Sequence, residues 1–488
     1  PYTTLFRSPP VGQVTTSNLN EGFFQEVNTP KLFDDVAVYN KTVMASDNLG
    51  QIVDTAIRTA FTEKGVAVLT IPDDLPDQKE TTSYRDSAAA FALNVPEVDP
   101  KQLDDVASLL QKSQKPLALI GRGAENAGEA VQKFVEANHI PFIQTMPAKG
   151  TVADDHPNSL GNVGKLGTKP AYEAMKATDL LFMIGTNYPY TPYLPDAGQA
   201  KCVQIDTQPE NLGKRYSVDV AVDGDVGAFL TELNAKGALR DDDRFLKACR
   251  KNMESWDKWM AEKRLLDTNP ASPEAVFATI DQTAPKDAVY SIDVGTSTSW
   301  GARFLNVQPT QKYTISAWLG TMGCGLPGAI AGAEAFPKRQ NISVAGDGAF
   351  AMVMQDFVTA VKYKLPIIMV VLNNQKLAFI EYEQQSAGQL NYEIDLADMD
   401  YAKIAEAAGG VGYTAHSNAE FKEALTKAYQ ETDKPVLINT YVQDDAPLPG
   451  KIVGEEAKGY MKYGSQYLEN YWKIPSMPPL KDIMRQFF

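Results

Sequence analysis

Two apolar runs, each closed by polar residues, decide the fold: Ile342-Ser-Val-Ala-Gly-Asp-Gly348 and Ile367-Ile-Met-Val-Val-Leu-Asn-Asn374. A short and nearly continuous apolar run is typical of a strand that is buried on both faces of a parallel sheet. Residues 349–363 lie between the two runs and predict a helix, so the whole segment is one strand–helix–strand crossover. Such a crossover places both strand ends at the same edge of the sheet, about 5 Å apart if the strands are neighbours.

Asp347 and Asn374 are therefore expected to lie together at an edge where α/β sheets bind ligands. A carboxylate and an amide oxygen are hard donors that suit Mg²⁺, and Mg²⁺ favours a diphosphate. Gly348 lets a phosphate approach the backbone, and the N-terminus of the following helix favours an anion. A strand-to-helix turn capped by an aspartate would explain Asp347 alone, but it leaves Asn374 without a role. The pair predicts a magnesium and diphosphate site.

The rest of the chain repeats the alternation of strands and helices, which predicts an α/β protein of consecutive, doubly wound parallel sheets. Residues 1–8 resemble a translated sequencing adapter, and we expect them to be foreign. Residues 9–77 are expected to be part of a first domain, and residues 78–102 a linker. We then expect a central domain over 103–239, a connecting helix over 240–270, a C-terminal domain over 271–446 and a tail over 447–488.

Composition narrows the function classes. The 488 residues carry 46 Lys and Arg against 61 Asp and Glu, a net charge of −15, and no basic stripe occurs. This balance excludes nucleic acid as the main partner, because phosphate neutralisation needs clustered cations. The three cysteines are scattered, so we expect a reducing, cytoplasmic location.

The Gly-Asp-Gly and Asn-Asn pattern resembles the motif of enzymes that use thiamine diphosphate. Further segments extend the resemblance to pyruvate oxidases over nearly the whole chain from about residue 11. These segments are Phe23–Glu26, Pro147–Gly150, Gly185–Pro189, Leu212–Arg215, Ser291–Gly295, Leu319–Ala329 and Leu377–Ile380.

The resemblance implies roles for individual residues. Asp347, Asn374 and the backbone carbonyl of Lys376 would bind Mg²⁺, and Met322 would hold thiamine diphosphate in its bent conformation. Further residues would line this cofactor: Gly295, Thr296, Gly346, Gly348, Ala349, Leu377 and Ala378. Phe379, Ile380 and Glu383 would face the substrate, pyruvate. Phe24 and Gln25 would reach the site of a neighbouring subunit, so the resemblance also implies a homo-oligomer, and a tetramer in particular.

The central domain would hold FAD. Gly121 and Gly123 match the first two glycines of a dinucleotide turn, but Asn126 stands where the third is expected, which argues against NAD. By the resemblance, FAD would contact eight residues: Gly121, Gly123, Thr145, Lys149, Gly185, Asn187, Asp206 and Asp225.

The implied reaction is the oxidative decarboxylation of pyruvate. The acetyl group would pass to phosphate or to water, and FAD would pass its electrons to O₂ or to a membrane quinone. An acetolactate synthase, or a fragment that binds cofactors without turnover, are the alternatives. The glutamate that activates the cofactor in this family has no counterpart here, so we expect a chain truncated by about 100 residues and inactive as it stands.

The end of the tail has an amphipathic pattern. Leu480, Ile483, Met484, Phe487 and Phe488 share one helical face. This face predicts either docking on the protein's own surface or contact with a membrane surface that would serve a quinone-linked enzyme.

Overall fold

A computed structural model describes residues 10–79, 97–444, 450–452, 454–471, 482, 484 and 485. The predictions for residues 1–8, for most of the linker, and for Leu480, Ile483, Phe487 and Phe488 of the tail lie outside the described residues. The chain divides into two units, with the boundary between Val95 and Pro96.

The first unit holds a small parallel sheet in the order β1-β3-β2. Its strands are β1 (Pro10–Gln13), β2 (Ala37–Thr42) and β3 (Val66–Pro72), and its helices are α1 (Thr29–Leu32) and α2 (Leu49–Thr62). The helix α2 buries Ala56 and Ala60 against Ala67 and Leu69 of β3. Small side chains let the helix lie close to the sheet.

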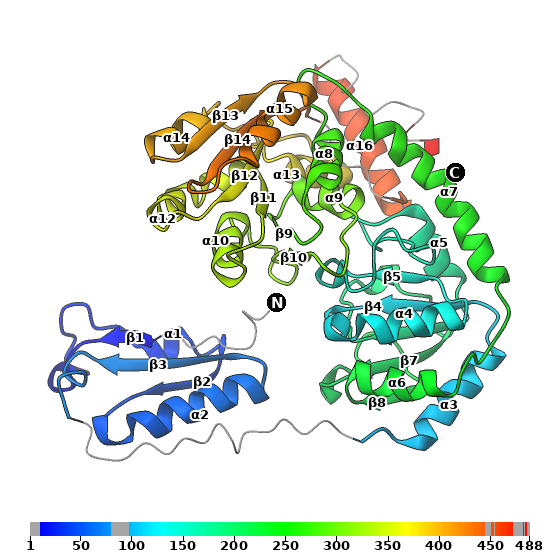
Figure 1. Ribbon diagram of the computed structural model, residues 1–488, viewed down its shortest axis with the longest axis horizontal. Helices are drawn as coiled ribbons and strands as arrows, with labels where there is room; N and C mark the ends of the chain where they lie inside the picture. The colour runs from blue at the N-terminus through cyan, green and yellow to red at the C-terminus, as the bar shows by residue number, and fades with distance from the viewer. Residues whose placement is uncertain are drawn as a thin grey trace. The chain divides into compact units, whose positions relative to one another are not determined.

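The second unit contains two larger sheets, and the first of them is parallel with the order β5-β4-β6-β7-β8. The strands are β4 (Pro116–Ile120), β5 (Phe142–Gln144), β6 (Leu180–Ile184), β7 (Lys201–Asp206) and β8 (Val220–Asp223). One face is covered by α3 (Pro100–Lys112), α4 (Gly128–Ala137) and α6 (Val226–Ala235), and the other by α5 (Lys169–Ala177). Figure 1 shows these two layers of helices.

The second of these sheets has six parallel strands in the order β10-β9-β11-β12-β14-β13. They are β9 (Val289–Ile292), β10 (Lys312–Thr314), β11 (Asn341–Gly346), β12 (Ile367–Asn373), β13 (Val411–Ala415) and β14 (Val436–Tyr441). One face carries α8 (Pro273–Thr283), α9 (Thr296–Phe304) and α15 (Asn418–Ala428). The other carries α10 (Gly325–Ala335), α11 (Asp347–Ala351), α12 (Phe357–Lys362) and α14 (Tyr401–Ala407). Helices on both faces of parallel sheets confirm the predicted fold class.

The predicted helix over 349–363 is wrong in its middle. The structure has α11, then a 3₁₀ turn at Met354–Asp356, then α12. Phe350 and Phe357 are both fully buried in the same core, and the turn lies between them. The break therefore lets two short helices, instead of one straight helix, cover this part of the sheet.

A long helix, α7 (Arg244–Arg264), joins the two larger domains (Figure 1). Phe245 and Cys249 of its first half are buried in the central domain, whereas Trp256 and Trp259 of its second half are buried in the core of the C-terminal domain. The described tail residues lie against this second half: Trp259 Nε1 donates to Asp482 Oδ1 at 3.1 Å, and Lys263 pairs with Asp482 at 2.9 Å. These contacts hold Asp482 on α7, whereas Met484, the one residue of the predicted apolar face that the structure describes, is 49% exposed.

Two more helices complete the C-terminal domain. The helix α13 (Ala378–Ser386) follows β12, and α16 (Gly454–Tyr471) packs against it. Among the described residues, no helix is both long enough and apolar enough to span a bilayer.

Candidate active site

Asp347 lies at the carboxyl end of β11, next to the end of β12. The two strands are neighbours, with Gly346 opposite Leu372. Oδ1 of Asp347 accepts a hydrogen bond from the Gly348 amide at 2.8 Å, and Oδ2 accepts one from the Gln375 amide at 2.6 Å. Burial raises the pKa of this carboxyl to about 6. The aspartate therefore reaches from one strand end to the loop that follows Asn374, as the crossover predicts.

The loop after β12 holds the second predicted donor. Oδ1 of Asn374 accepts from the Lys376 amide at 3.2 Å, and Gln375 adopts a left-handed conformation with φ +59°. The Lys376 ammonium pairs with Glu381 at 3.4 Å and with Asp444. These contacts hold the lysine side chain in place. The Mg²⁺ ligand predicted at this position is the backbone carbonyl of Lys376, not its side chain.

Asn373, the first residue of the Asn-Asn pair, anchors this loop. Its Nδ2 donates to Met399 O at 3.3 Å and to Asn439 Oδ1 at 3.2 Å. Tyr401 follows Met399 by two residues, and its hydroxyl donates to Asp347 O at 3.2 Å. Sequence reasoning gave Asn373 and Tyr401 no role, because their partners are distant in sequence.

Two glycines of the motif face different surroundings. A Cβ on Gly348 would lie 2.8 Å from Leu377 Cδ2 and 3.8 Å from Met322 Cε, so Gly348, Leu377 and Met322 meet at one place. A Cβ on Gly346 would meet nothing within 4 Å, and its backbone (φ −69°, ψ 158°) suits any residue. The protein's own packing does not require glycine at 346, which points to a ligand approaching the backbone there.

Asp293, at the end of β9, holds the turn that carries Met322. This fully buried carboxylate accepts from the amides of Val294 at 2.7 Å, Gly323 at 2.9 Å and Gly325 at 2.7 Å. Burial raises its pKa, while the backbone amides oppose the rise. The sequence places Asp293 beside the predicted cofactor residues Gly295 and Thr296, but only the folded turn shows its function.

We expect Asp293→Asn to destabilise the protein by about 2 kcal/mol, because an amide NH₂ would face at least one of the three backbone donors. Thiamine diphosphate affinity should fall as well, since the turn that carries Met322 would shift. Urea unfolding and calorimetric titration measure the two effects. Ser343→Ala is the matched control: Ser343 is buried in the same place, and its Oγ has no hydrogen-bond partner among the described residues. An unchanged stability of the Asp293 variant would contradict this role.

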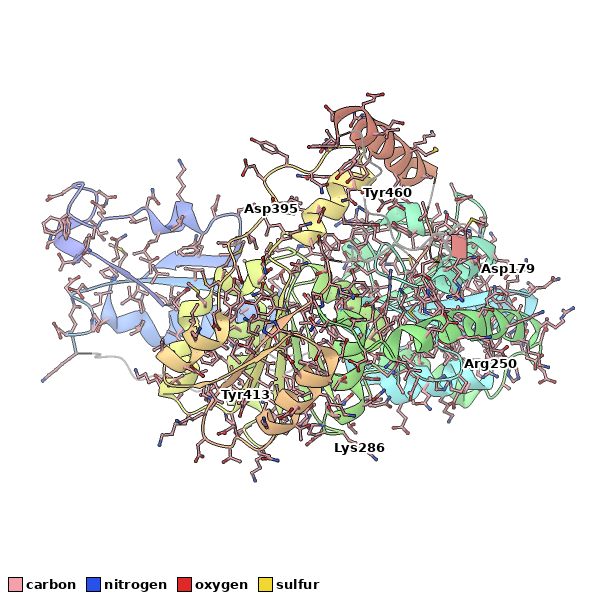
Figure 2. All side chains as sticks on the ribbon, turned by 90° about the horizontal axis from the view of Figure 1, so that it is seen from above. Asp179, Arg250, Lys286, Asp395, Tyr413 and Tyr460 are labelled. Atoms are coloured by element: carbon pink, nitrogen blue, oxygen red, sulfur yellow. The ribbon has the colours of Figure 1, made fainter. Side chains whose placement is uncertain are left out.

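The remaining residues predicted around thiamine diphosphate and pyruvate lie in or directly before α9, α11 and α13. Gly295, with φ +141°, immediately precedes α9, which Thr296 begins, and Ala349 lies in α11. Ala378, Phe379, Ile380 and Glu383 all lie on α13. Figure 2 shows Tyr460 of α16 beside that helix; its ring centroid is 6.3 Å from that of Tyr382.

The central domain brings three predicted glycines together. The Gly121 amide donates to Ile184 O at 2.8 Å, and the Gly123 amide donates to Gly185 O at 2.9 Å. A Cβ on Gly123 would lie 2.8 Å from the Gly185 Cα, and Gly185 itself has φ +62°. The protein's own backbone therefore requires glycine here, because the ends of β4 and β6 pack directly against each other. They do so at the carboxyl edge of the sheet, where α/β sheets bind ligands.

The other residues predicted to contact FAD also follow strand ends. The Thr145 amide donates to Ile120 O at 2.9 Å, and Asp206 Oδ1 accepts from the Gln208 amide at 2.9 Å. Asn187 donates through Nδ2 to Asn211 at 2.9 Å, but its buried Oδ1 has no hydrogen-bond partner among the described residues. Asp225 caps α6 by accepting from the Ala228 amide. The ammonium of Lys149 is engaged by Asp154.

Phe24 and Gln25 belong to the first unit, whereas the other predicted site residues belong to the second. The carboxylate of Glu26 accepts from the amides of Asn20, Gly22 and Phe23, which closes the loop around it. Phe24 is 78% exposed, and Gln25 has φ +66°. The loop thus presents an aromatic ring to its surroundings.

Among the described residues, no group of three or more His, Cys, Asp and Glu side chains could hold a metal ion. A divalent ion at Asp347 would therefore need amide and carbonyl oxygens as further ligands. The carboxylate of Asp347 and the amide oxygen of Asn374 lie at the sheet edge where α/β proteins bind ligands. This arrangement is typical of α/β proteins that bind a diphosphate through a divalent ion.

Comparison with known proteins gives the family. The model of the C-terminal thiamine pyrophosphate (thiamine diphosphate) binding domain matches residues 293–440, and the model of the central domain of thiamine pyrophosphate enzymes matches 103–233. The chain belongs to the thiamine pyrophosphate enzyme family.

Three relatives illustrate its range. YdaP of Bacillus subtilis, whose name describes it as containing thiamine pyrophosphate, is 41% identical over 98% of this chain and 82% of its own length. A pyruvate oxidase of Lactiplantibacillus plantarum is 32% identical over 98% of this chain and 80% of its own. An acetolactate synthase of Mycobacterium bovis is 28% identical over 89% of this chain and 73% of its own.

Proposed function

We propose that this protein catalyses the oxidative decarboxylation of pyruvate with thiamine diphosphate, Mg²⁺ and FAD. The observation that carries the proposal is the meeting of Asp347 and the Asn374 loop at one sheet edge. The glycine-lined edge of the central domain supports a second, flavin site, and the pyruvate oxidase at 32% identity supports the reaction. When bound, thiamine diphosphate supplies an electron sink for decarboxylation and FAD accepts two electrons.

The residues at the C-terminal sheet fit thiamine diphosphate and Mg²⁺. Asp347, Asn374 and the Lys376 carbonyl form a set of hard oxygen donors. A Cβ on Gly346 would meet no atom within 4 Å, so a diphosphate would have room there, beside the first residues of α11. Met322 lies next to Gly348 and Leu377, where it would support the cofactor from below.

The residues at the central sheet fit FAD. Gly121, Gly123 and Gly185 bring the ends of β4 and β6 together at the carboxyl edge, and the unpartnered Oδ1 of Asn187 offers an acceptor to a ligand. An acceptor buried without a partner is costly, so a donor from the flavin cofactor would satisfy it.

Pyruvate would lie against α13, where Phe379, Ile380 and Glu383 would bind it and exclude water. Phe24 and Gln25 would complete the site from a second copy of the chain. Large apolar side chains that remain exposed in the second unit, among them Trp318 at 76% and Leu319 at 81%, support an assembly of copies. Both residues precede Met322 in the same segment, so a partner covering them would lie next to the cofactor site.

The test uses the full-length protein loaded with thiamine diphosphate, Mg²⁺ and FAD. Under anaerobic conditions, pyruvate should bleach the visible flavin absorbance in a single turnover. Acetolactate formation without bleaching would overturn the proposal in favour of carboligation.

Two further measurements define the acceptors. Phosphate-dependent formation of acetyl phosphate, as opposed to acetate, identifies the acyl acceptor. Re-oxidation by O₂ with peroxide release, or by a soluble quinone, identifies the electron acceptor.

A separate measurement concerns the tail. Binding of the protein to anionic lipid vesicles tests a peripheral membrane contact through the tail.

A further inference from the structure

Lys149 and Asp154 form a buried ion pair between the two larger domains. Nζ of Lys149 lies 2.5 Å from Asp154 Oδ2, and the two side chains are only 3% and 9% exposed. Both residues belong to the segment that follows β5 in the central domain. Asp154 is also held from its own domain, because Gln144 Nε2 donates to its Oδ1 at 2.9 Å.

The pair also bonds to the C-terminal domain from both of its members. Lys149 donates to Ala302 O at 3.3 Å, near the end of α9, and Val307 N donates to Asp154 Oδ2 at 2.8 Å. The backbone repeats the contact, since the Asp154 amide donates to Val307 O at 3.1 Å. Gly150, with φ +84°, packs so closely that a Cβ there would lie 2.7 Å from Val307 Cγ1. Charge, backbone and packing therefore meet at one interdomain contact.

The two domains also share α7. A shared helix alone would let the domains rotate about it, so contacts such as that of the Lys149–Asp154 pair are needed to fix their relative position. A cavity of about 580 Å³ lies beside the pair, lined by Lys149, Asp154, Trp256 and Arg303 among others, so packing alone does not close the interface there. Arg250 of α7, labelled in Figure 2, lines the same cavity.

Other polar contacts between the domains are more exposed or longer. Gln308 donates to Asp155 at 3.0 Å in an exposed position, Arg303 donates to the carbonyls of residues 165–167 at 3.3–3.5 Å, and Lys312 lies 3.9 Å from Glu125. The bonds from Val307 to Asp154 and from Lys149 to Ala302 involve side chains that are shielded from water, so they resist screening better than the exposed contacts.

The pair lies between the elements that carry the two predicted cofactor sites. On one side, Thr145 and the end of β5 belong to the edge proposed for FAD. On the other side, Ala302 lies in α9, whose first residue is Thr296 at the edge proposed for thiamine diphosphate. We propose that Lys149 and Asp154 are positioning residues that lock the central domain to α9 and thereby set the flavin site against the thiamine diphosphate site. The cofactor part of this inference rests on the proposed function.

The first test concerns the contact of Lys149 and Asp154 with Ala302 and Val307, called here the lock, and uses the protein without cofactors. Hydrogen exchange of the cofactor-free protein, read by mass spectrometry, compares the wild type with Lys149→Met. Exchange of residues 302–308, which belong to the other domain, should quicken about tenfold or more, because removing one partner leaves the other charge buried and unpaired. Lys201→Met is the matched control: Lys201 pairs with Asp219 at 2.7 Å on the surface of the central domain alone. Exchange at 302–308 that equals the wild type would overturn the lock.

The cofactor coupling is tested by kinetics. In Lys149→Met, anaerobic flavin reduction by pyruvate should slow about tenfold or more, since small displacements of reacting groups cost large factors in rate. The reaction is run with FAD at saturation, because Lys149 is itself among the residues predicted to contact FAD. The affinity for thiamine diphosphate should stay within about threefold of the wild type, because none of its proposed ligands changes its contacts. Asp154→Asn, which leaves Lys149 in place, should slow flavin reduction as well. Unchanged flavin reduction, a fall in Lys149→Met alone, or a thiamine diphosphate affinity that falls in step with the rate would overturn the positioning role.

A second variant covers loss of folding. If Lys149→Met does not fold, Lys149→Met with Asp154→Asn removes both charges and keeps an acceptor for the Val307 amide. It should show a smaller rise in exchange and a smaller fall in rate, because the bond to Ala302 O is lost but no charge is left buried and unpaired. Wild-type values for both would overturn the proposal. If the wild-type flavin is not reduced by pyruvate at all, the proposed function fails, while the exchange measurement still decides whether the lock exists.

Discussion

Asp347→Asn is expected to abolish Mg²⁺-dependent binding of thiamine diphosphate and with it all turnover. The variant keeps the shape of the side chain but removes the charge, and one of its two oxygens becomes an NH₂ that faces either the Gly348 or the Gln375 amide. Loss of residues that merely support a metal ligand costs about 10–100-fold in metal affinity, so loss of the ligand itself should cost at least about 100-fold. Isothermal titration with thiamine diphosphate, with and without Mg²⁺, measures the effect.

Asp287→Asn is the control for this variant, because Asp287 is exposed and precedes β9, at the opposite edge of the same sheet. The melting temperature of cofactor-free Asp287→Asn should equal that of the wild type. Cofactor-free Asp347→Asn should lose about 2 kcal/mol, because an NH₂ faces a backbone donor in a buried place, so binding is titrated well below its melting temperature. Mg²⁺-dependent binding by Asp347→Asn equal to that of the wild type would refute the proposed ligand role.

Gly346→Ala should separate stability from binding. Because the backbone at 346 suits any residue and a Cβ meets nothing within 4 Å, alanine should raise the free energy of unfolding by about 0.4–1 kcal/mol. The same methyl group would occupy the space proposed for the diphosphate, so thiamine diphosphate affinity should fall about tenfold or more. Gly346→Val should lower it further. Urea unfolding of the cofactor-free protein and titration calorimetry read the two quantities.

Gly464→Ala on α16 is the matched control, since it also places a Cβ in open space. It should gain stability without any loss of binding. If Gly346→Ala bound the cofactor as tightly as the wild type, the open space at Gly346 would not be a ligand site.

Strands that are nearly continuous apolar runs could be predicted from the sequence. The apolar parts of the two runs that begin at Ile342 and Ile367 match β11 and β12 to within one or two residues. The strand β13 was not predicted, because Gly412 interrupts it and its side chains are only partly buried. Gly412 is required there by close packing, since a Cβ would lie 2.2 Å from Ala402 O. Such a requirement comes from a neighbouring helix and leaves no local pattern.

The same distinction holds for the site. The convergence of Asp347 with the Asn374 loop follows from one crossover, so sequence reasoning reaches it. Asp293 acts through a turn about 30 residues further along the chain, as its bonds to Gly323 and Gly325 show. The partners of Lys149 across the interface lie about 150 residues away. Contacts of this range depend on how whole elements pack, and no local pattern of residues records them.

The shared helix α7 also constrains how this protein can be divided or recombined. A cut before Arg244 would deprive the central domain of Phe245 and Cys249, whereas a cut after Arg264 would expose Trp256 and Trp259 and strip the C-terminal core of two of its aromatic side chains. Neither fragment would carry a complete interior. The helix α7 thus contributes side chains to the cores of both domains. A chimera that exchanges one domain must therefore either take that domain and α7 from the same parent and redesign the surface of the other domain against which α7 packs, or keep α7 and redesign the surface of the new domain.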